Sequence, residues 1–170
     1  AGILGGNAGM VGAALLAGRA ALWLGTGRVY VGLLDANGPA VDFAHPELML
    51  RRAHALPEHL SALAVGPGLG TEGTSASLLA AALERNIPLL LDADALNLSG
   101  ADPILKHALA ARTAPTVLTP HPAEAARMLG TDTASVQADR LHAALEIAAQ
   151  YKALVVLKGC GSIVATPDGR

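Results

Sequence analysis

The chain has 170 residues, which is the size of one domain, and its 52% hydrophobic and 15% charged residues predict a substantial buried core rather than disorder. A formal net charge of −2, with only one Trp, two Tyr and one Phe, argues against binding to nucleic acids or to anionic membrane surfaces. The single cysteine, Cys160, excludes an internal disulfide and a cysteine metal cluster, and it suits a reducing cytoplasm, which is the expected location.

Short apolar runs alternate along the chain with stretches of helical periodicity. The runs predicted as strands are Ile3–Leu4, Val29–Leu34, Leu63–Val65, Leu89–Leu91, Thr116–Leu118, Leu154–Leu157 and Ser162–Ala165. The stretches predicted as helices are Ala8–Leu24, Thr74–Arg85, Pro103–Ala111, Pro122–Leu129 and Ala134–Tyr151. Runs that are apolar on both faces indicate parallel strands covered on two sides, so the alternation predicts a layered α/β fold. Asn37–His59 is the least patterned segment, and we expect it to be a surface excursion.

In an open α/β sheet, ligands bind beyond the carboxyl ends of the strands, so the residues after each run are the candidates for a site. The stretch "ILGGNAGMVGAA" fits a backbone that a ligand approaches at a helix N-terminus, and it fits equally well a turn followed by tight helix packing. It matches neither a Walker loop nor a dinucleotide fingerprint. The stretch "LAVGPGLGTEGTS" places Gly66, Gly68 and Gly70 after a strand. That spacing favours a loop whose amides bind phosphate or carboxylate oxygens over a simple connecting turn.

Two carboxylates and an amide follow the run Leu89–Leu91, at Asp92, Asp94 and Asn97. Carboxylates at such a position can orient a hydroxyl, act as a base, or hold Mg²⁺ through water. Helix capping is the alternative, and Asp94 fits that role by itself. The presence of both carboxylates beside Asn97 favours a functional role.

A histidine lies between two prolines in "TVLTPHPAEAARMLG". Pro122 suits the first turn of a helix, which predicts His121 as its N-cap and Glu124 as the third helical residue. A neutral imidazole at a helix N-terminus can also donate and accept hydrogen bonds with a ligand. The sequence leaves both interpretations open.

Lys158 directly follows the run Leu154–Leu157 and is itself followed by the loop 159–162. A lysine beside exposed backbone amides is typical of a phosphate contact, and the same residues fit the turn of a β-hairpin. Both descriptions can hold together. Cys160 is interpreted as a small packed residue rather than a nucleophile, because no activating partner is apparent. The other histidines lack metal-ligand spacing.

Five stretches, in this order, resemble the ADP/ATP-dependent NAD(P)H-hydrate dehydratases of the ribokinase-like superfamily: "GGNAGMVGAALLAGRAALWLGTGRVYV", "VGPGLG", "LLDADALNL", "TPHPAEAARMLG" and "VVLKGCGSIVATPDG". The resemblance implies a ribokinase-like three-layer sandwich, a mostly parallel sheet with helices on both faces. It implies repair of the hydrated cofactors NADHX and NADPHX, in which ADP or ATP with Mg²⁺ phosphorylates the added hydroxyl and phosphate then leaves. It also implies a homo-oligomer, often a tetramer, and many bacterial relatives carry an epimerase domain fused upstream.

The resemblance implies roles for individual residues. Together with the strand-end residues above, the predicted substrate-binding set is Ala13, Gly68, Gly70, Asp92, Asn97 and His121. The predicted nucleotide contacts are Lys158, Gly159, Cys160, Gly161 and Ser162. Glu124 occupies a place like that of the glutamate in the Asn-x-x-Glu motif of related kinases, which organises Mg²⁺.

Members of this family continue past the "PDG" hairpin into a "GTGD" segment, whose aspartate is the expected catalytic base. The resemblance places that aspartate beyond Arg170, the last of these residues. We therefore expect a single ribokinase-like domain over residues 1–170 that is incomplete at the C-terminus, has no catalytic residue of its own and does not turn over alone. Two alternatives stay open, a ribokinase-like kinase of the hydroxyethylthiazole type and a non-catalytic nucleotide-binding module.

Overall fold

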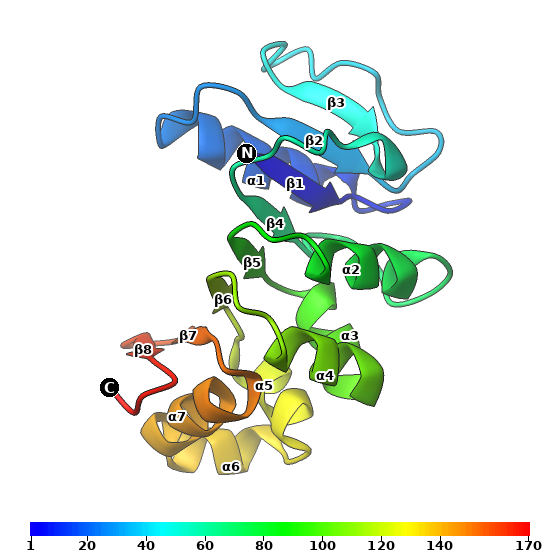
Figure 1. Cartoon of the computed structure of the whole chain (residues 1–170). Helices are drawn as coiled ribbons and strands as arrows, with labels where there is room; N and C mark the ends of the chain where they lie inside the picture. Colours follow the sequence, from blue (N-terminus) through cyan, green and yellow to red (C-terminus); the bar gives the residue numbers. More distant parts are fainter.

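The computed structural model describes residues 1–170, whose strands form one eight-stranded sheet in the order β3-β2-β1-β4-β5-β6-β7-β8 (Figure 1). The strands are β1 (Gly2–Gly5), β2 (Tyr30–Leu33), β3 (Met49–Arg52), β4 (Leu63–Val65), β5 (Leu89–Leu91), β6 (Thr116–Leu118), β7 (Leu154–Leu157) and β8 (Ile163–Ala165). All neighbours are parallel except β8, which returns antiparallel to β7. The seven predicted strands and the predicted hairpin are confirmed.

The α-helices lie in the connections that follow β1, β4, β5 and β6. They are α1 (Val11–Trp23), α2 (Ser75–Leu83), α3 (Asp94–Ala101), α4 (Pro103–Ala110), α5 (Pro122–Leu129), α6 (Thr133–Ala138) and α7 (Arg140–Tyr151), with one 3-10 turn, η1 (Ala53–Ala55). A helix that crosses a membrane has to be both long and apolar, and none of these meets that requirement. Five of the seven helices lie within predicted helical stretches.

The helices form two layers, one on each face of the sheet. Ile3 and Leu4 point to opposite faces, because successive side chains of a strand alternate. Ile3 packs with Val31 and with Ala14 of α1. Leu4 belongs to the larger core, which takes in buried residues of α2 to α7. The predicted three-layer arrangement is therefore confirmed.

The layer formed by α1 covers only part of its face. The strand register places Leu90 and Leu154 on the same face as Ile3, and Val164 continues that face on β8. These three side chains are 37%, 37% and 63% exposed. The prediction that the strands are covered on both sides is wrong for β5 to β8, because α1 is the one helix on this face and it packs against β1 and β2.

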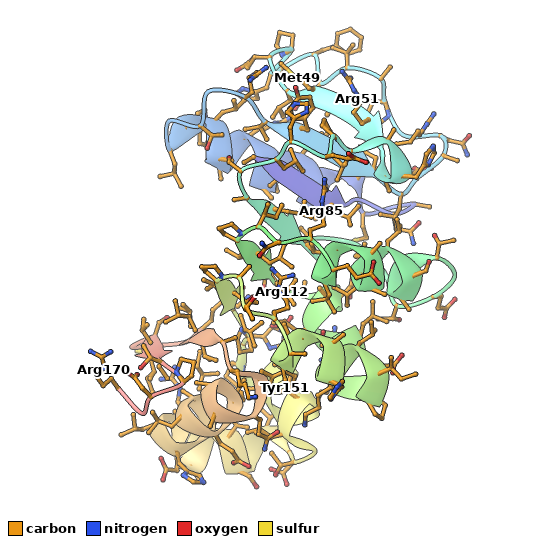
Figure 2. All side chains as sticks on the ribbon, in the orientation of Figure 1. Met49, Arg51, Arg85, Arg112, Tyr151 and Arg170 are labelled. Carbon is orange, nitrogen blue, oxygen red and sulfur yellow. The ribbon has the colours of Figure 1, made fainter.

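The predicted surface excursion at Asn37–His59 is also wrong in part, because it contains β3 and η1. β3 is an edge strand in which Leu50 alone is buried, so it lacks the apolar pattern of a central strand. Arg51 lies 5.9 Å from the centre of the Tyr30 ring. Met49 and Arg51 are labelled on this outermost strand in Figure 2.

Two helical segments differ from the prediction. α3 was not predicted, and the stretch predicted as one helix over Ala134–Tyr151 is two helices separated at Asp139. Asp139 has non-helical torsions (φ −143°, ψ 80°), and its side chain accepts a hydrogen bond from the backbone N–H of His142 (2.9 Å). Aspartate satisfies such unpaired amides at a helix start, so the break is locally stable.

The buried tyrosine of α7 should make stability depend on alkaline pH. Tyr151 has no exposed surface, its hydroxyl donates to the carbonyl of Met128 (3.1 Å), and burial raises its pKa to about 12 (Figure 2). Between pH 10 and 12 the unfolded chain loses this proton while the native chain keeps it, so the free energy of unfolding falls as pH rises, by about 2–3 kcal/mol. In urea titrations the free energy of unfolding of Tyr151→Phe should not show this part of the decline at alkaline pH. At neutral pH the variant should be about 1 kcal/mol less stable, because the hydrogen bond to Met128 is lost. An equal decline in both proteins would contradict this.

Candidate active site

Most of the predicted site residues lie along the carboxyl edge of the sheet, in or next to the loops after β1, β4, β5, β6 and β7. Two glycine loops meet first. The N–H of Gly6 donates to Pro67 O (3.0 Å), and the N–H of Asn7 donates to Gly68 O (2.6 Å). A Cβ on Gly5 would lie 2.1 Å from Pro67 O. The absence of a side chain at Gly5 therefore allows the β1 and β4 loops to touch.

The β4 loop then packs on the start of α1 and on the β5 loop. A Cβ on Gly68, which has φ +62°, would lie 3.3 Å from the Cβ of Ala13, so these two predicted substrate-binding residues are neighbours. The N–H of Gly70 donates to Oδ2 of Asp94 (2.8 Å). No side chain caps α3, so the interpretation of Asp94 as a helix cap is wrong, and its carboxylate joins two loops instead.

The turn after β5 separates its two carboxylates. A Cβ on Gly66, which has φ +125°, would lie 1.8 Å from Asp92 O, so the backbones of the two loops are in direct contact. Ala93 has φ 51° and ψ −118°, a conformation that costs a residue with a Cβ about 1–3 kcal/mol. This turn leaves Asp94 on the Gly70 side and directs Asp92 toward β7.

A charged cluster joins β5, β7 and the start of α5. The ammonium of Lys158 lies 2.6 Å from Oδ1 of Asp92 and 3.9 Å from Oε2 of Glu124. The backbone N–H of Lys158 donates to Pro120 O (2.8 Å), which holds the β6 and β7 loops together. The Glu124 side chain is 5% exposed, whereas those of Lys158 and Asp92 are 40% and 31% exposed. The lysine side chain is therefore accessible to a ligand from solvent, whereas the Glu124 carboxylate is accessible only from within the site.

His121 is the N-cap of α5, as predicted. Its Nδ1 accepts from the backbone N–H groups of Ala123 (3.1 Å) and Glu124 (3.3 Å), and Oε2 of Glu124 accepts from the backbone N–H of His121 (2.8 Å). Because Nδ1 is an acceptor, a neutral ring carries its proton on Nε2, which lies 3.2 Å from Oε1 of Glu124. The ring is 47% exposed, so it caps the helix and still presents a surface to a ligand.

Two predicted residues are placed differently. Asn97 accepts a hydrogen bond from Arg127 (3.0 Å) and so links α3 to α5, without a hydrogen bond to any other predicted site residue. Cys160 is exposed, and its interpretation as a packed residue is wrong because it lies at the tip of the hairpin between β7 and β8.

The residues that follow β8 form an ion pair of their own. The guanidinium of Arg170 lies 2.6 Å from Oδ2 of Asp168 and holds the pKa of that carboxyl below its usual value. Arg170 is labelled in Figure 2, where its side chain points away from the rest of the molecule. Asp168 is engaged by Arg170 and by the hydroxyl of Thr166, and neither it nor Arg170 bonds to a predicted site residue. Asp168 is therefore not a substitute for the catalytic aspartate, whose position beyond Arg170 stays a prediction.

The hairpin loop has an unusual distribution of hydrogen bonds. The backbone N–H groups of residues 159 to 162 have no acceptor within the protein. Carbonyls at the start of the hairpin turn, by contrast, are engaged, because Arg140 donates to Cys160 O (2.7 Å), Leu157 O (3.3 Å) and Lys158 O (3.4 Å). No sequence motif pointed to Arg140, which lies at the first position of α7. The sequence signal that points to it is an arginine at the start of the helix before β7, together with a glycine just after that strand.

The site offers few protein ligands for a cation. No group of three or more His, Cys, Asp or Glu side chains converges in the structure. Asp92 and Glu124 are the carboxylates closest to Lys158. Mg²⁺ is commonly bound by one or two carboxylates, with ligand phosphates and water completing its octahedron. These residues therefore fit a cation that arrives with a phosphorylated ligand.

The largest described hollow lies away from this edge. It has a volume of about 440 Å³, lies between α2 and α4, and is lined by Leu83, Arg85, Ile104 and Arg112 among others. Arg85 and Arg112 precede β5 and β6, so the hollow lies at the amino ends of the strands (Figure 2). Ligands of open α/β sheets bind at the carboxyl ends, and the strand-end loops are the stronger candidate.

Known proteins match this chain along its whole length. A family model described as NAD(P)H-hydrate dehydratase matches residues 1–170. The ADP-dependent (S)-NAD(P)H-hydrate dehydratase of Neisseria meningitidis is 46% identical over 98% of this chain and 57% of its own length. For the bifunctional NAD(P)H-hydrate repair enzyme Nnr of Escherichia coli, the identity is 39% over 98% of this chain and 32% of that protein.

A solved structure shares the fold. The ADP/ATP-dependent NAD(P)H-hydrate dehydratase of Bacillus subtilis, co-crystallized with ATP/Mg²⁺, superposes with a TM-score of 0.80 at 34% identity. The superposition covers 99% of this chain and 60% of that one. The chain thus spans between about a third and three fifths of the length of these relatives.

Proposed function

This chain belongs to the NAD(P)H-hydrate dehydratase family, and we propose that its strand-end loops form the hydrate- and nucleotide-binding part of an enzyme that repairs NADHX and NADPHX with ADP or ATP and Mg²⁺. The cluster around Lys158 carries the proposal. Its ammonium lies between Asp92 and Glu124 and directly precedes four backbone N–H groups that have no acceptor. Ammonium and clustered amides bind phosphate oxygens, and adjacent carboxylates suit Mg²⁺.

Different residues along the carboxyl edge of the sheet bind the nucleotide, the cation and the hydrate. Lys158 and the amides of residues 159 to 162 bind the nucleotide phosphates, and Glu124 with Asp92 holds the cation. Bound Mg²⁺ would supply charge neutralisation at the phosphates. Ala13, Gly68, Gly70 and His121 line the hydrate, whose added hydroxyl faces the phosphates.

The proposed reaction transfers a phosphoryl group to the hydroxyl of the hydrate. Phosphate then leaves with the C–O electron pair, the neighbouring ring position loses a proton, and the dihydropyridine double bond is restored. Such a transfer depends mainly on positioning and on neutralising charge, which the loops provide. Asp92 is paired with Lys158, and Asp94 accepts from Gly70. With Asp92 assigned to the cation and Asp94 engaged by Gly70, neither carboxylate is assigned to take the hydroxyl proton, which supports placing the base in a further segment of the domain, beyond Arg170.

The apolar face over β5 to β8 also supports a larger domain. Leu90, Leu154 and Val164 lie on one face of the sheet and are exposed, and an apolar strip of this kind is stabilised when another element covers it. In this proposal the 170 residues bind both ligands but do not turn over by themselves. A homo-oligomer and an epimerase domain fused upstream stay predictions.

A chimera tests the proposed function. Residues 1–170 are joined to the remaining C-terminal part of the Neisseria meningitidis relative and incubated with NADHX and ADP. We expect absorbance of the reduced nicotinamide to return with the chimera but not with residues 1–170, although both bind ADP with Mg²⁺ in calorimetry. A chimera with asparagine in place of the "GTGD" aspartate is the matched control and should stay inactive.

The other outcomes separate the alternatives. Turnover by residues 1–170 alone would overturn the assignment of the base to another segment. A stable phosphorylated alcohol, without return of the reduced nicotinamide, would identify a ribokinase-like kinase. Nucleotide binding without either product in the chimera would identify a non-catalytic module.

A further inference from the structure

We propose that Arg140 is a positioning residue for nucleotide binding, which holds the loop 159–162 so that its backbone N–H groups face the phosphates. This inference rests on the proposed function and deepens it. Arg140 is the first residue of α7, and it contacts the loop through three carbonyl oxygens, those of Leu157, Lys158 and Cys160. One guanidinium thereby fixes the orientation of three peptide units on both sides of Gly159.

The loop geometry depends on this contact. Gly159 has φ +153°, and a Cβ at that position would lie 2.7 Å from the Nη2 atom of Arg140. A glycine is needed here so that the guanidinium can lie against the backbone. Oγ of Ser162 donates to the one remaining carbonyl of this part of the loop, that of Gly159 (3.4 Å). Carbonyls 157 to 160 therefore all accept from side chains of the protein itself.

The consequence for the amides follows from the peptide unit. The C=O and N–H groups of a peptide point in opposite directions because the unit is planar and trans. The carbonyls of Leu157, Lys158 and Cys160, which are drawn toward Arg140, therefore direct the N–H groups of Lys158, Gly159 and Gly161 away from it. The N–H of Lys158 donates to Pro120 O, whereas those of Gly159 and Gly161 have no acceptor in the protein. Backbone N–H groups that are left without an acceptor in a turn can form an anion-binding concavity.

The partial burial of the Arg140 side chain supports a dedicated role. Its Nε atom is buried and has no hydrogen-bond partner, which is unfavourable for a polar group. A positive charge at a helix start is also unfavourable with the helix dipole, so Arg140 does not lie there to stabilise α7. Its positive charge beside the loop also raises the affinity of the amides for an anion.

The test compares two ligands that differ only in phosphate. Dissociation constants for ADP with Mg²⁺ and for adenosine are measured by calorimetry on residues 1–170 and on Arg140→Met. We expect Arg140→Met to weaken ADP binding about tenfold to a hundredfold, while adenosine binding changes less than about threefold. Arg85→Met is the matched control, because Arg85 also donates to a backbone carbonyl, that of Pro57 (2.6 Å), at the opposite edge of the sheet.

Two further variants keep the test decisive. Arg140→Lys keeps the charge but not the fork of donors, so it should recover only part of the lost ADP affinity. Gly159→Ala pushes a Cβ against the guanidinium and should weaken ADP binding in the same phosphate-dependent way. Unchanged ADP affinity in Arg140→Met, an equal loss for ADP and adenosine, or full recovery by Arg140→Lys would each overturn the inference. Failure of the unsubstituted chain to bind ADP would instead overturn the proposed function.

Discussion

Replacing Lys158 by methionine is expected to weaken ADP binding about a hundredfold while leaving the fold intact. The ammonium belongs to the residue directly before the loop 159–162, and it lies 2.6 Å from Asp92. Hydrogen bonds to charged groups contribute about 1.5–3 kcal/mol, and loss of the ammonium also leaves Asp92 and Glu124 to repel the phosphates. The Lys158–Asp92 pair is partly exposed, and pairs of that kind contribute at most about 1 kcal/mol to folding.

Lys158→Met should lower the ADP affinity strongly but change the free energy of unfolding little. ADP affinity is measured by calorimetry and unfolding by urea titration on the same samples, with Lys106→Met as the matched control. Lys106 contacts Gln150 (2.9 Å) and the Tyr151 ring (5.0 Å), so it loses the same charge from α4, away from the loops. Wild-type ADP affinity in Lys158→Met would place the phosphates elsewhere. An unfolded Lys158→Met protein would show that the ion pair is structural.

The central strands could be predicted because burial on both sides of a strand leaves a continuous apolar run. The runs of β5 to β8 are also apolar, although one face of these strands is partly exposed, and the signal is absent only from β3. β3 has a single buried residue, Leu50, because it lies at the edge of the sheet. α3 starts directly after the turn at Ala93, and its polar first residues resembled a site more than a helix. The break at Asp139 was hidden because an aspartate suits both a helix surface and an N-cap.

The individual residues of the candidate site could be predicted from the sequence, but the contacts between them could not. Asp92, Glu124 and Lys158 were identified from their positions after predicted strands. The capping box of His121 follows from local spacing alone. The contact of Lys158 with Asp92 depends on strand order, since β5 and β7 are separated only by β6, and strand order is not encoded in any local pattern. The role of Arg140 was missed for the same reason, because its contacts are 17 to 20 residues away.

Several glycines that resembled a ligand loop turn out to pack against backbone. Gly5 and Gly66 allow neighbouring loops to approach within distances that no Cβ would permit. A glycine-rich loop therefore reports close approach, and the sequence alone does not say whether the partner is a ligand or another strand end. The loop 159–162 differs, because its amides have no partner in the protein.

Substitution of Glu124 by glutamine should abolish the Mg²⁺ dependence of nucleotide binding without loss of the helix start. Glutamine keeps an oxygen that can accept from the N–H of His121, as Oε2 does now at 2.8 Å, so the free energy of unfolding should change by less than about 1 kcal/mol. Glu124→Ala removes that acceptor and should cost about 1–2 kcal/mol as well. The charge that a hard cation requires is lost in both variants.

The measurement is ADP affinity with Mg²⁺ and with a chelator, together with turnover in the chimera. In the unsubstituted protein Mg²⁺ should strengthen ADP binding, whereas in Glu124→Gln the two affinities should coincide and turnover should fall about a hundredfold or more. Glu146→Gln, at an exposed position of α7 paired with Gln150 (3.0 Å), is the matched control and should behave as the unsubstituted protein. If Glu124→Gln keeps its Mg²⁺ response, the cation is held by the phosphates and Asp92, and Glu124 serves only as the partner of His121 in the capping box.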